Sequence, residues 1–220
     1  MPDMTPFHLV LASSSPYRKM LLERFNMPFF VVSPLVDETP LEGERPDALV
    51  VRLAEAKARA GAALFLASND AQPRAQKTLV IGSDQVADYS GVPIGKPHDF
   101  DRAWAQLKQL SGQTVVFRTG LSLFDVAHQR CETLRVDVTT VYRQLSDEEI
   151  VAYLKAAEPY QCAGAIRSED LGIALLDKIE SDDPTALIGL PLIALARLMR
   201  AAGVNPVLGS PKSKPLLLGG

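Results

Sequence analysis

The chain has 220 residues, of which 47% are hydrophobic and 22% are charged, a balance typical of a globular protein that folds without disulfides or structural metals. Its net charge of −3 argues against a surface built to attract nucleic acid, which would need a strong basic excess. The sequence shows no signal-peptide pattern and no apolar run of the ~18 residues that a membrane helix needs. We therefore expect a cytoplasmic protein with neither a membrane nor a nucleic-acid partner.

The first predicted elements are a strand and a helix joined by serines. Leu9 to Ala12 form an apolar run suited to a short buried strand, and the apolar spacing over 17–26 is helical. Pro16 suits the first turn of that helix, where its missing N–H costs nothing. The three serines at 13–15 therefore lie in a strand-to-helix loop.

This loop is a candidate phosphate site. Free N–H groups at a helix start and the positive end of the helix dipole favour an anion, and Arg18 and Lys19 add full charges. The alternative interpretation is that Ser15 merely caps the helix while the two cations face water.

The middle of the chain predicts two strands and a long helix. In chain order we expect a strand over 29–32, a helix from Pro46 to about Leu66, a polar surface loop over 68–77 and a strand over 79–83. Asp37 and Glu38 fall in the Pro-rich connection before the helix. Asp84 and Gln85 are expected directly after the last of these strands.

The C-terminal half mixes strands and helices. We expect a helix capped by Asp99 and ended by Ser111, an antiparallel hairpin of strands over 113–125 and 131–143, a capping-box helix from Ser146 to about Ala157, a Gly-interrupted stretch over 162–174, and a helix from Pro191 to Met199. The class is therefore α/β or α+β. A tail rich in Pro, Gly and Lys follows, and we expect it to be loosely held.

Four ionisable residues outside the serine loop lie near predicted strand ends, turns or helix faces: Glu38, Lys57, Asp84 and Lys96. Cations that bind phosphate oxygens and carboxylates that hold a metal ion or activate water are what phosphoryl chemistry needs. A solvated turn would explain Glu38 and an exposed position would explain either lysine. Asp84 favours function, because a carboxylate ending an apolar strand is costly unless it is hydrogen-bonded or lies in a cleft.

Seven ordered segments resemble the Maf family of nucleotide pyrophosphatases, over about Leu9 to Leu208. The segments are LASSSPYRK at 11–19, VDETP at 36–40, LAEAKA at 53–58, IGSDQV at 81–86, GKP at 95–97, CAGAIRSED at 162–170 and IGLPL at 188–192. The resemblance implies an α/β, Maf-like (anticodon-binding-like/ITPase-like) fold, in which a two-lobed mixed sheet flanked by helices surrounds a central cleft. It implies one domain over 1–208, a tail over 209–220, and a homodimer, as in many members.

The resemblance also implies an activity, the hydrolysis of a nucleoside triphosphate to the monophosphate and pyrophosphate with a divalent cation, Mg²⁺ or Mn²⁺. Asp84 matches the proton acceptor, Glu38 a carboxylate needed for metal or water, and Lys57 and Lys96 the cleft lysines. In this interpretation Glu38 and Asp84 hold the metal, and water oriented by Asp84 attacks the α-phosphorus.

Further positions match the family's phosphate-gripping loop, namely Ser13, Arg18 and Lys19. Family members usually have arginine where this chain has Lys19, which removes a bidentate donor from that point.

Three positions indicate a subfamily. Tyr17, Gln85 and Glu169 resemble the aromatic, glutamine and glutamate of the members that hydrolyse 7-methyl-GTP, whereas members acting on dTTP and UTP have Arg, Thr and Gln there. A methylated guanine is cationic, so it gains a cation–π interaction of roughly 0.5–2 kcal/mol on an aromatic ring. Its N1–H and N2–H edge suits a carboxylate acceptor. Tyr17, where tryptophan is more frequent, and Asp170, where glycine is usual, depart from that pattern.

Three alternatives stay open at this point. The enzyme could act on dTTP, UTP or another modified nucleotide. The chain could instead be a nucleotide-binding regulator of cell division with incidental catalysis. Nucleic-acid binding is weaker, because the cations are dispersed among carboxylates.

Overall fold

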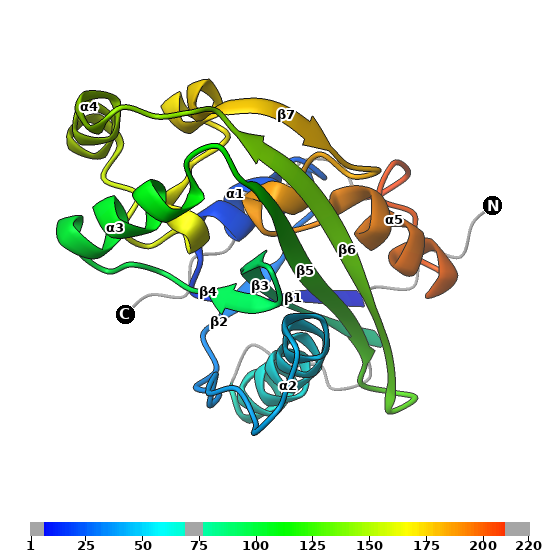
Figure 1. Ribbon diagram of the computed structural model, residues 1–220. Coiled ribbons are helices and arrows are strands. Elements are labelled where there is room, and N and C mark those ends of the chain that lie inside the picture. Colours follow the sequence, from blue (N-terminus) through cyan, green and yellow to red (C-terminus); the bar gives the residue numbers. More distant parts are fainter. Residues whose placement is uncertain (1–6, 69–76, 210–220) are drawn as a thin grey trace.

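A computed structural model describes residues 7–68 and 77–209 of the protein. In these residues seven strands form one mixed sheet of order β2-β1-β3-β5-β6-β7, with β4 beside β3 (Figure 1). The strands are β1 (Phe7–Ala12), β2 (Phe30–Val32), β3 (Lys77–Tyr89), β4 (Val92–Ile94), β5 (Thr114–Asp125), β6 (Arg130–Tyr142) and β7 (Leu176–Glu180). The α-helices are α1 (Pro16–Glu23), α2 (Pro46–Ala67), α3 (Phe100–Leu110), α4 (Asp147–Ala157) and α5 (Leu192–Ala201). None of these helices is long and apolar enough to cross a membrane.

Helices cover both faces of the sheet, but unequally. Alternate residues of a strand point to opposite faces. The even-numbered Val10 and Val80 pack against α2, whereas the odd-numbered Leu79 and Ile81 pack with residues of α1 and α5. Residues of α3 and α4 pack with the odd-numbered Phe117 of β5. Helix α2 therefore covers one face alone, and the other four α-helices cover the opposite face (Figure 1).

Glycines bring α2 close to the sheet. A Cβ added at Gly82 of β3 would lie 2.1 Å from the carbonyl oxygen of Ala54, and one at Gly120 of β5 would lie 2.0 Å from that of Val50. Any larger residue would force the helix away from the sheet. This close approach fixes the height of α2, and of its Lys57, above β3.

One edge of β3 is left open near its centre. On this edge β1 pairs with residues 77–82 and β4 pairs with residues 87–89, so residues 83–86 have no strand beside them there. The other edge is paired to β5 from Leu79 to Asp88. The opening lies where β1 ends and the serine loop begins. A ligand at this opening can contact side chains on both faces of β3.

The prediction that the strand ends before Asp84 is wrong, because β3 continues to Tyr89. Pairing with the distant β5 holds the polar residues in the ladder, and this non-local pairing leaves no local signal. The short β4 and β7 were not predicted. Strand β7 is exposed and charged at the edge of the sheet, which is typical of edge strands.

Most other predicted elements are confirmed. Asp99 caps α3, Ser146 forms a capping box on α4, and β5 and β6 form the long hairpin. Helix α1 ends at Glu23, earlier than expected, and α5 starts at Leu192. The stretch after Cys162 forms 3-10 turns over Ala163–Ala165 and Leu171–Leu175. The predicted loop over 68–77 and tail over 209–220 lie almost wholly outside the described residues.

Candidate active site

The serine loop both caps α1 and lines a cavity. The Ser15 hydroxyl accepts a hydrogen bond from the Arg18 amide at 3.4 Å, so its role as a helix cap is confirmed. The Ser13 hydroxyl accepts from the Ser15 amide at 3.1 Å. The Arg18 Nε donates to the carbonyl of Gly189 at 2.9 Å, and its Nη1 donates to Ser13 at 3.4 Å. The loop that caps α1 therefore also holds the Arg18 guanidinium at the cavity.

Three predicted residues meet on the α2 face of β3, and we call them the reaction end of the site. The Lys57 Nζ lies 2.7 Å from Oδ1 of Asp84 and 2.5 Å from Oε1 of Glu38. Lys57 and Asp84 are both buried, each at 8% exposure, which rules out a solvated helix lysine. The ammonium therefore compensates the buried carboxylate of Asp84, and it also contacts Glu38, whose side chain is 59% exposed.

The loop that carries Glu38 is tied to α2. Arg52 forms two 2.7 Å hydrogen bonds to the carboxylate of Glu44 and a third, at 3.1 Å, to the carbonyl of Thr39. A bidentate arginine–carboxylate pair fixes direction as well as distance. This pair holds the segment after Glu38 against the helix that carries Lys57.

Charges around the reaction end act on one another. Burial opposes ionisation of Glu38, but Lys57, Lys96 and Arg18 together hold its pKa below the ordinary value. Burial lowers the pKa of Arg18, while Asp84 and Glu38 oppose that change. Glu38 is therefore held in its charged form, surrounded by cations.

A cavity of about 330 Å³ lies on the opposite face of β3. We call the part formed by Tyr17, Gln85 and Glu169 the base end, because these are the residues matched to base recognition. The cavity lining comprises Ser14, Ser15, Pro16, Tyr17, Arg18, Gln85, Lys96, Phe117, Gln161, Cys162, Ala163, Ile166, Glu169, Leu187, Ile188 and Gly189. The lining thus brings the serine loop together with residues 161–169 and 187–189, which are more than a hundred residues away in the sequence.

Hydrogen bonds fix the direction of Gln85. Its Nε2 lies 3.0 Å from Oγ1 of Thr119, 2.7 Å from the carbonyl of Ala186 and 3.1 Å from that of Leu187. Both hydrogens of the Gln85 side-chain amide are therefore used in hydrogen bonds within the protein. The Oε1 is left as the atom able to accept a hydrogen bond from a ligand.

Arg18 and Lys96 connect the two ends, since both line the cavity and both act on the charge of Glu38. Lys96 is exposed on the turn after β4. Lys19 is half-buried and is not among the residues that line the cavity. The structure therefore brings together all the predicted site residues except Lys19.

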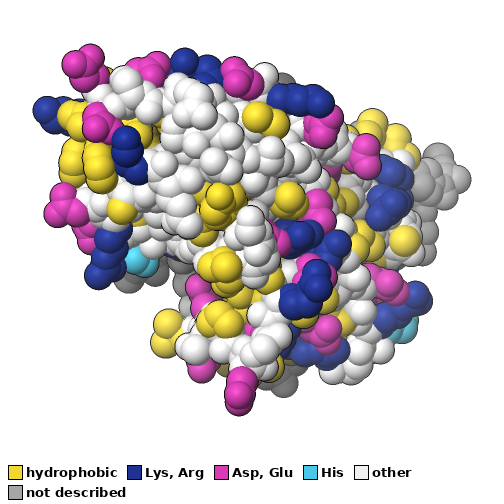
Figure 2. Space-filling view, in the orientation of Figure 1, with side chains coloured by type: hydrophobic (Ala, Val, Ile, Leu, Met, Phe, Trp, Pro, Cys, Tyr) yellow, Lys and Arg dark blue, Asp and Glu magenta, His cyan; other side chains and the backbone are white. Residues whose placement is uncertain are grey.

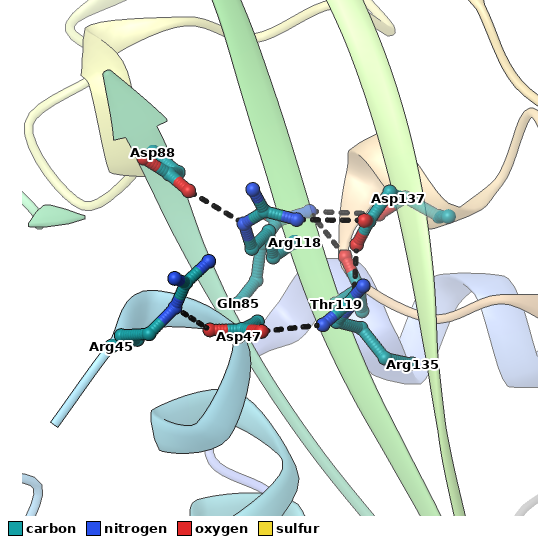
Figure 3. A network of polar contacts seen from close by, with 9 residues as sticks. Arg45, Asp47, Gln85, Asp88, Arg118, Thr119, Arg135 and Asp137 are labelled. Atoms are coloured by element: carbon teal, nitrogen blue, oxygen red, sulfur yellow. Dashed lines mark hydrogen bonds and ion pairs between the residues drawn. The ribbon is translucent and has the colours of Figure 1, made fainter. Parts of the chain in front are cut away.

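A balanced network of charges holds the start of α2 (Figure 3). Arg118 of β5 contacts Asp88 of β3 at 2.6 Å and Asp137 of β6 at 2.7 Å. Arg135 joins Asp137 at 2.9 Å to Asp47 of α2 at 3.1 Å. In Figure 2 the same region, where α2 meets β5 and β6, shows basic and acidic side chains next to one another. The network ties α2 to three strands at once.

Several contact residues were missed by sequence reasoning. Gly189 accepts from Arg18, and its φ of 116° is a left-handed conformation that favours glycine. Ser83 lies 3.0 Å from the same carbonyl, so it ties β3 to that turn. Arg167 lies beside Tyr17. The segments CAGAIRSED and IGLPL contain Arg167 and Gly189, but no local pattern assigns them these contacts.

Comparisons with known proteins agree with the resemblance. A family model described as Maf-like protein matches residues 8–202. A 7-methyl-GTP pyrophosphatase of Burkholderia thailandensis is 54% identical, covering 93% of this chain and 92% of its own. Proteins of the same name are 53% identical in a Polaromonas species, covering 89% and 85%, and 49% identical in Bordetella pertussis, covering 96% and 100%. The residues matched by the family model include those of both the reaction end and the base end.

Proposed function

The chain belongs to the Maf family, and from this premise we propose that it hydrolyses 7-methyl-GTP to 7-methyl-GMP and pyrophosphate. The observation that carries the proposal is that the reaction end and the base end lie on opposite faces of β3 at the open stretch of its edge. A nucleotide lying across this opening would place its base and its triphosphate in different chemical surroundings.

The triphosphate would meet the cations between the two ends. Arg18 and Lys96 supply full charges, and the serine loop supplies hydroxyls and the N-terminus of α1. These groups stabilise the negative charge that develops on the phosphate oxygens as the bond to pyrophosphate breaks. Because these groups bind the phosphates, Lys57 can keep its contacts with Glu38 and Asp84.

Asp84 would act as general base. It takes a proton from water as the water oxygen bonds to the α-phosphorus, and the bond from that phosphorus to the leaving pyrophosphate breaks. Lys57 contacts Oδ1 of Asp84, so Oδ2 is the oxygen that we assign to water. Lys57 thereby fixes the carboxylate's direction.

The reaction end fits a divalent cation. The Glu38 and Asp84 carboxylates both lie against the Lys57 ammonium, each with its second oxygen left for another ligand, and Mg²⁺ is commonly bound by one or two carboxylates together with substrate phosphates. In the described residues no three Asp, Glu, His or Cys side chains gather into a metal site of their own. Glu38 and Asp84 would hold Mg²⁺ or Mn²⁺ jointly with the substrate. The ion supplies charge neutralisation at the phosphate oxygens.

The base end suits a cationic purine. The Tyr17 ring offers a π face to the methylated guanine, and the Glu169 carboxylate accepts from its N1–H and N2–H edge. Gln85 offers a further acceptor, since its amide hydrogens are committed. The homodimer, the cytoplasmic location and the two-lobed division of the domain stay predictions.

A nucleotide panel tests the proposal. Purified protein is assayed for pyrophosphate release from 7-methyl-GTP, GTP, dTTP and UTP with Mg²⁺ or Mn²⁺. We expect the highest kcat/KM for 7-methyl-GTP. A preference for a pyrimidine would overturn the assignment of Tyr17 and Glu169, and no pyrophosphate release from any nucleotide would favour a nucleotide-binding regulator.

A further inference from the structure

Arg167 lies behind the base end. Tyr17 and Glu169 line the cavity and Arg167 does not, yet the Cζ of Arg167 lies 5.5 Å from the centroid of the Tyr17 ring. Its Nε lies 3.9 Å from Oε1 of Glu169. One guanidinium therefore contacts both of the side chains that would recognise a methylated guanine.

The guanidinium is anchored on its far side. Its Nη1 donates to the carbonyl of Ala157, the last residue of α4, at 3.1 Å. Its Nη2 lies 3.4 Å from Oδ2 of Asp170, the position where the resembling family usually has glycine. The amide of Arg167 donates to the Tyr153 hydroxyl at 2.9 Å, which fixes the backbone as well. Arg167 is therefore held in place by groups that do not line the cavity.

The Nε of Arg167 makes no hydrogen bond among the described residues, although Glu169 lies near it. This Nε is buried and has no hydrogen-bond partner in the described part of the chain, and Oε1 of Glu169 lies 3.9 Å from it. A buried donor in this state attracts a nearby acceptor, because leaving it unpaired costs about 1–3 kcal/mol. The Nε therefore attracts the Glu169 carboxylate toward its own side of the cavity.

The charges of this group also match the proposed ligand. Glu169 and Asp170 contribute two negative charges and Arg167 one positive charge, so the group carries a surplus of one negative charge. A methylated guanine carries one delocalised positive charge. The two carboxylates would attract this charge, whereas an unmethylated guanine carries no positive charge for them to attract.

We propose that Arg167 is a positioning residue for base specificity, which braces the Tyr17 ring from the side away from the cavity and holds the Glu169 carboxylate for a cationic purine. This role rests on the proposed function. It predicts that loss of the guanidinium affects binding of the methylated base and spares the reaction end, which Arg167 does not contact.

Steady-state kinetics of Arg167→Gln test the role, with 7-methyl-GTP and GTP as paired substrates. We expect KM for 7-methyl-GTP to rise about tenfold, KM for GTP to change less than about twofold, and kcat to stay within about threefold. Arg167→Lys keeps a cation behind the ring and should retain most of the preference. Arg130→Gln changes an exposed arginine paired with Glu132 at the start of β6; it is the control and should resemble the wild type.

Three outcomes would overturn the role. A lower KM for 7-methyl-GTP in Arg167→Gln would mean that the guanidinium competes with the base. Equal losses on both substrates would mean a general structural effect. An unchanged KM for both substrates would mean no role in specificity. If the Gln variant does not fold, Asp170→Asn takes its place, and we expect about a twofold to threefold loss of preference, whereas a retained preference would contradict the role.

The wild type separates this inference from the proposed function. If the wild-type enzyme shows no preference for 7-methyl-GTP, the proposed function fails and the role of Arg167 fails with it. If the wild type shows the preference and the Arg167 variants keep it, only the role of Arg167 fails.

Discussion

The reaction end and the base end are held in different ways. Lys57, Asp84 and Glu38 meet at 2.5 and 2.7 Å, and two of them lie on a long helix and a long central strand. Tyr17 and Glu169 are joined through Arg167 at 5.5 and 3.9 Å, and Glu169 lies in an irregular segment between 3-10 turns. Two residues of the proposed reaction end are thus held by regular elements that pack against each other, whereas Glu169 of the proposed base end lies in an irregular segment that can change without disturbing the sheet.

The largest expected effect tests the reaction end. We expect Asp84→Asn to lower kcat by about 10²- to 10⁴-fold, because the variant loses its proton acceptor, and to leave nucleotide binding largely intact. Pyrophosphate release and calorimetric binding of the nucleotide measure the two parts separately. Asp177→Asn, an exposed change on β7, is the matched control. Undiminished turnover in Asp84→Asn would contradict the assignment of the base.

The next effect tests whether the close approach of α2 supports the reaction end. Gly82→Ala places a Cβ 2.1 Å from the Ala54 carbonyl, so α2 and its Lys57 must shift. We expect a loss of about 1–3 kcal/mol in the free energy of unfolding, measured with urea, together with reduced kcat. Gly95→Ala meets no atom within 4 Å and should cost much less. Equal stability of the two variants would contradict the claim that the close packing of α2 on β3 supports the reaction end.

A smaller effect is expected at the base end. Tyr17→Leu keeps an apolar side chain but removes the π face, so KM for 7-methyl-GTP should rise about 2- to 30-fold with kcat largely unchanged. Tyr17→Phe keeps the ring and should stay near the wild type. A fall in kcat comparable to that of Asp84→Asn would remove the distinction between the two ends.

The smallest effect concerns the loop that carries Glu38. The hydrogen bond from Arg52 holds the pKa of Glu44 down from its ordinary 4.5 to about 2. Because the folded state has the lower pKa, the pair stabilises fully above about 4.5 and loses this contribution as the pH falls toward about 2. The free energy of unfolding of the wild type should exceed that of Glu44→Gln by less than about 1 kcal/mol near neutrality, and the difference should vanish in acid. Glu42→Gln, an exposed change in the same loop, is the matched control and should have the stability of the wild type.

Local signals predicted the elements better than they predicted the site's contacts. The cap at Asp99 and the capping box at Ser146 are short-range patterns, and both are confirmed. The prediction that the strand ends before Asp84 was wrong, since pairing of β3 with β5 sets where the strand ends. Arg167 and Gly189 lie about 150 and 171 residues from the side chains that they contact, Tyr17 and Arg18. No spacing rule reaches across such distances, so the base end was available only through the family resemblance.

The unbroken pairing of β3 with β5 also limits how the molecule can move. The ladder runs from Leu79 to Asp88, beneath both the α5 side and the α3–α4 side of the sheet. The two sides therefore share one continuous ladder of backbone hydrogen bonds in the middle of the sheet. We therefore expect a ligand to enter and leave by motion of side chains and of the short segments around the opening, while the two sides of the sheet move together.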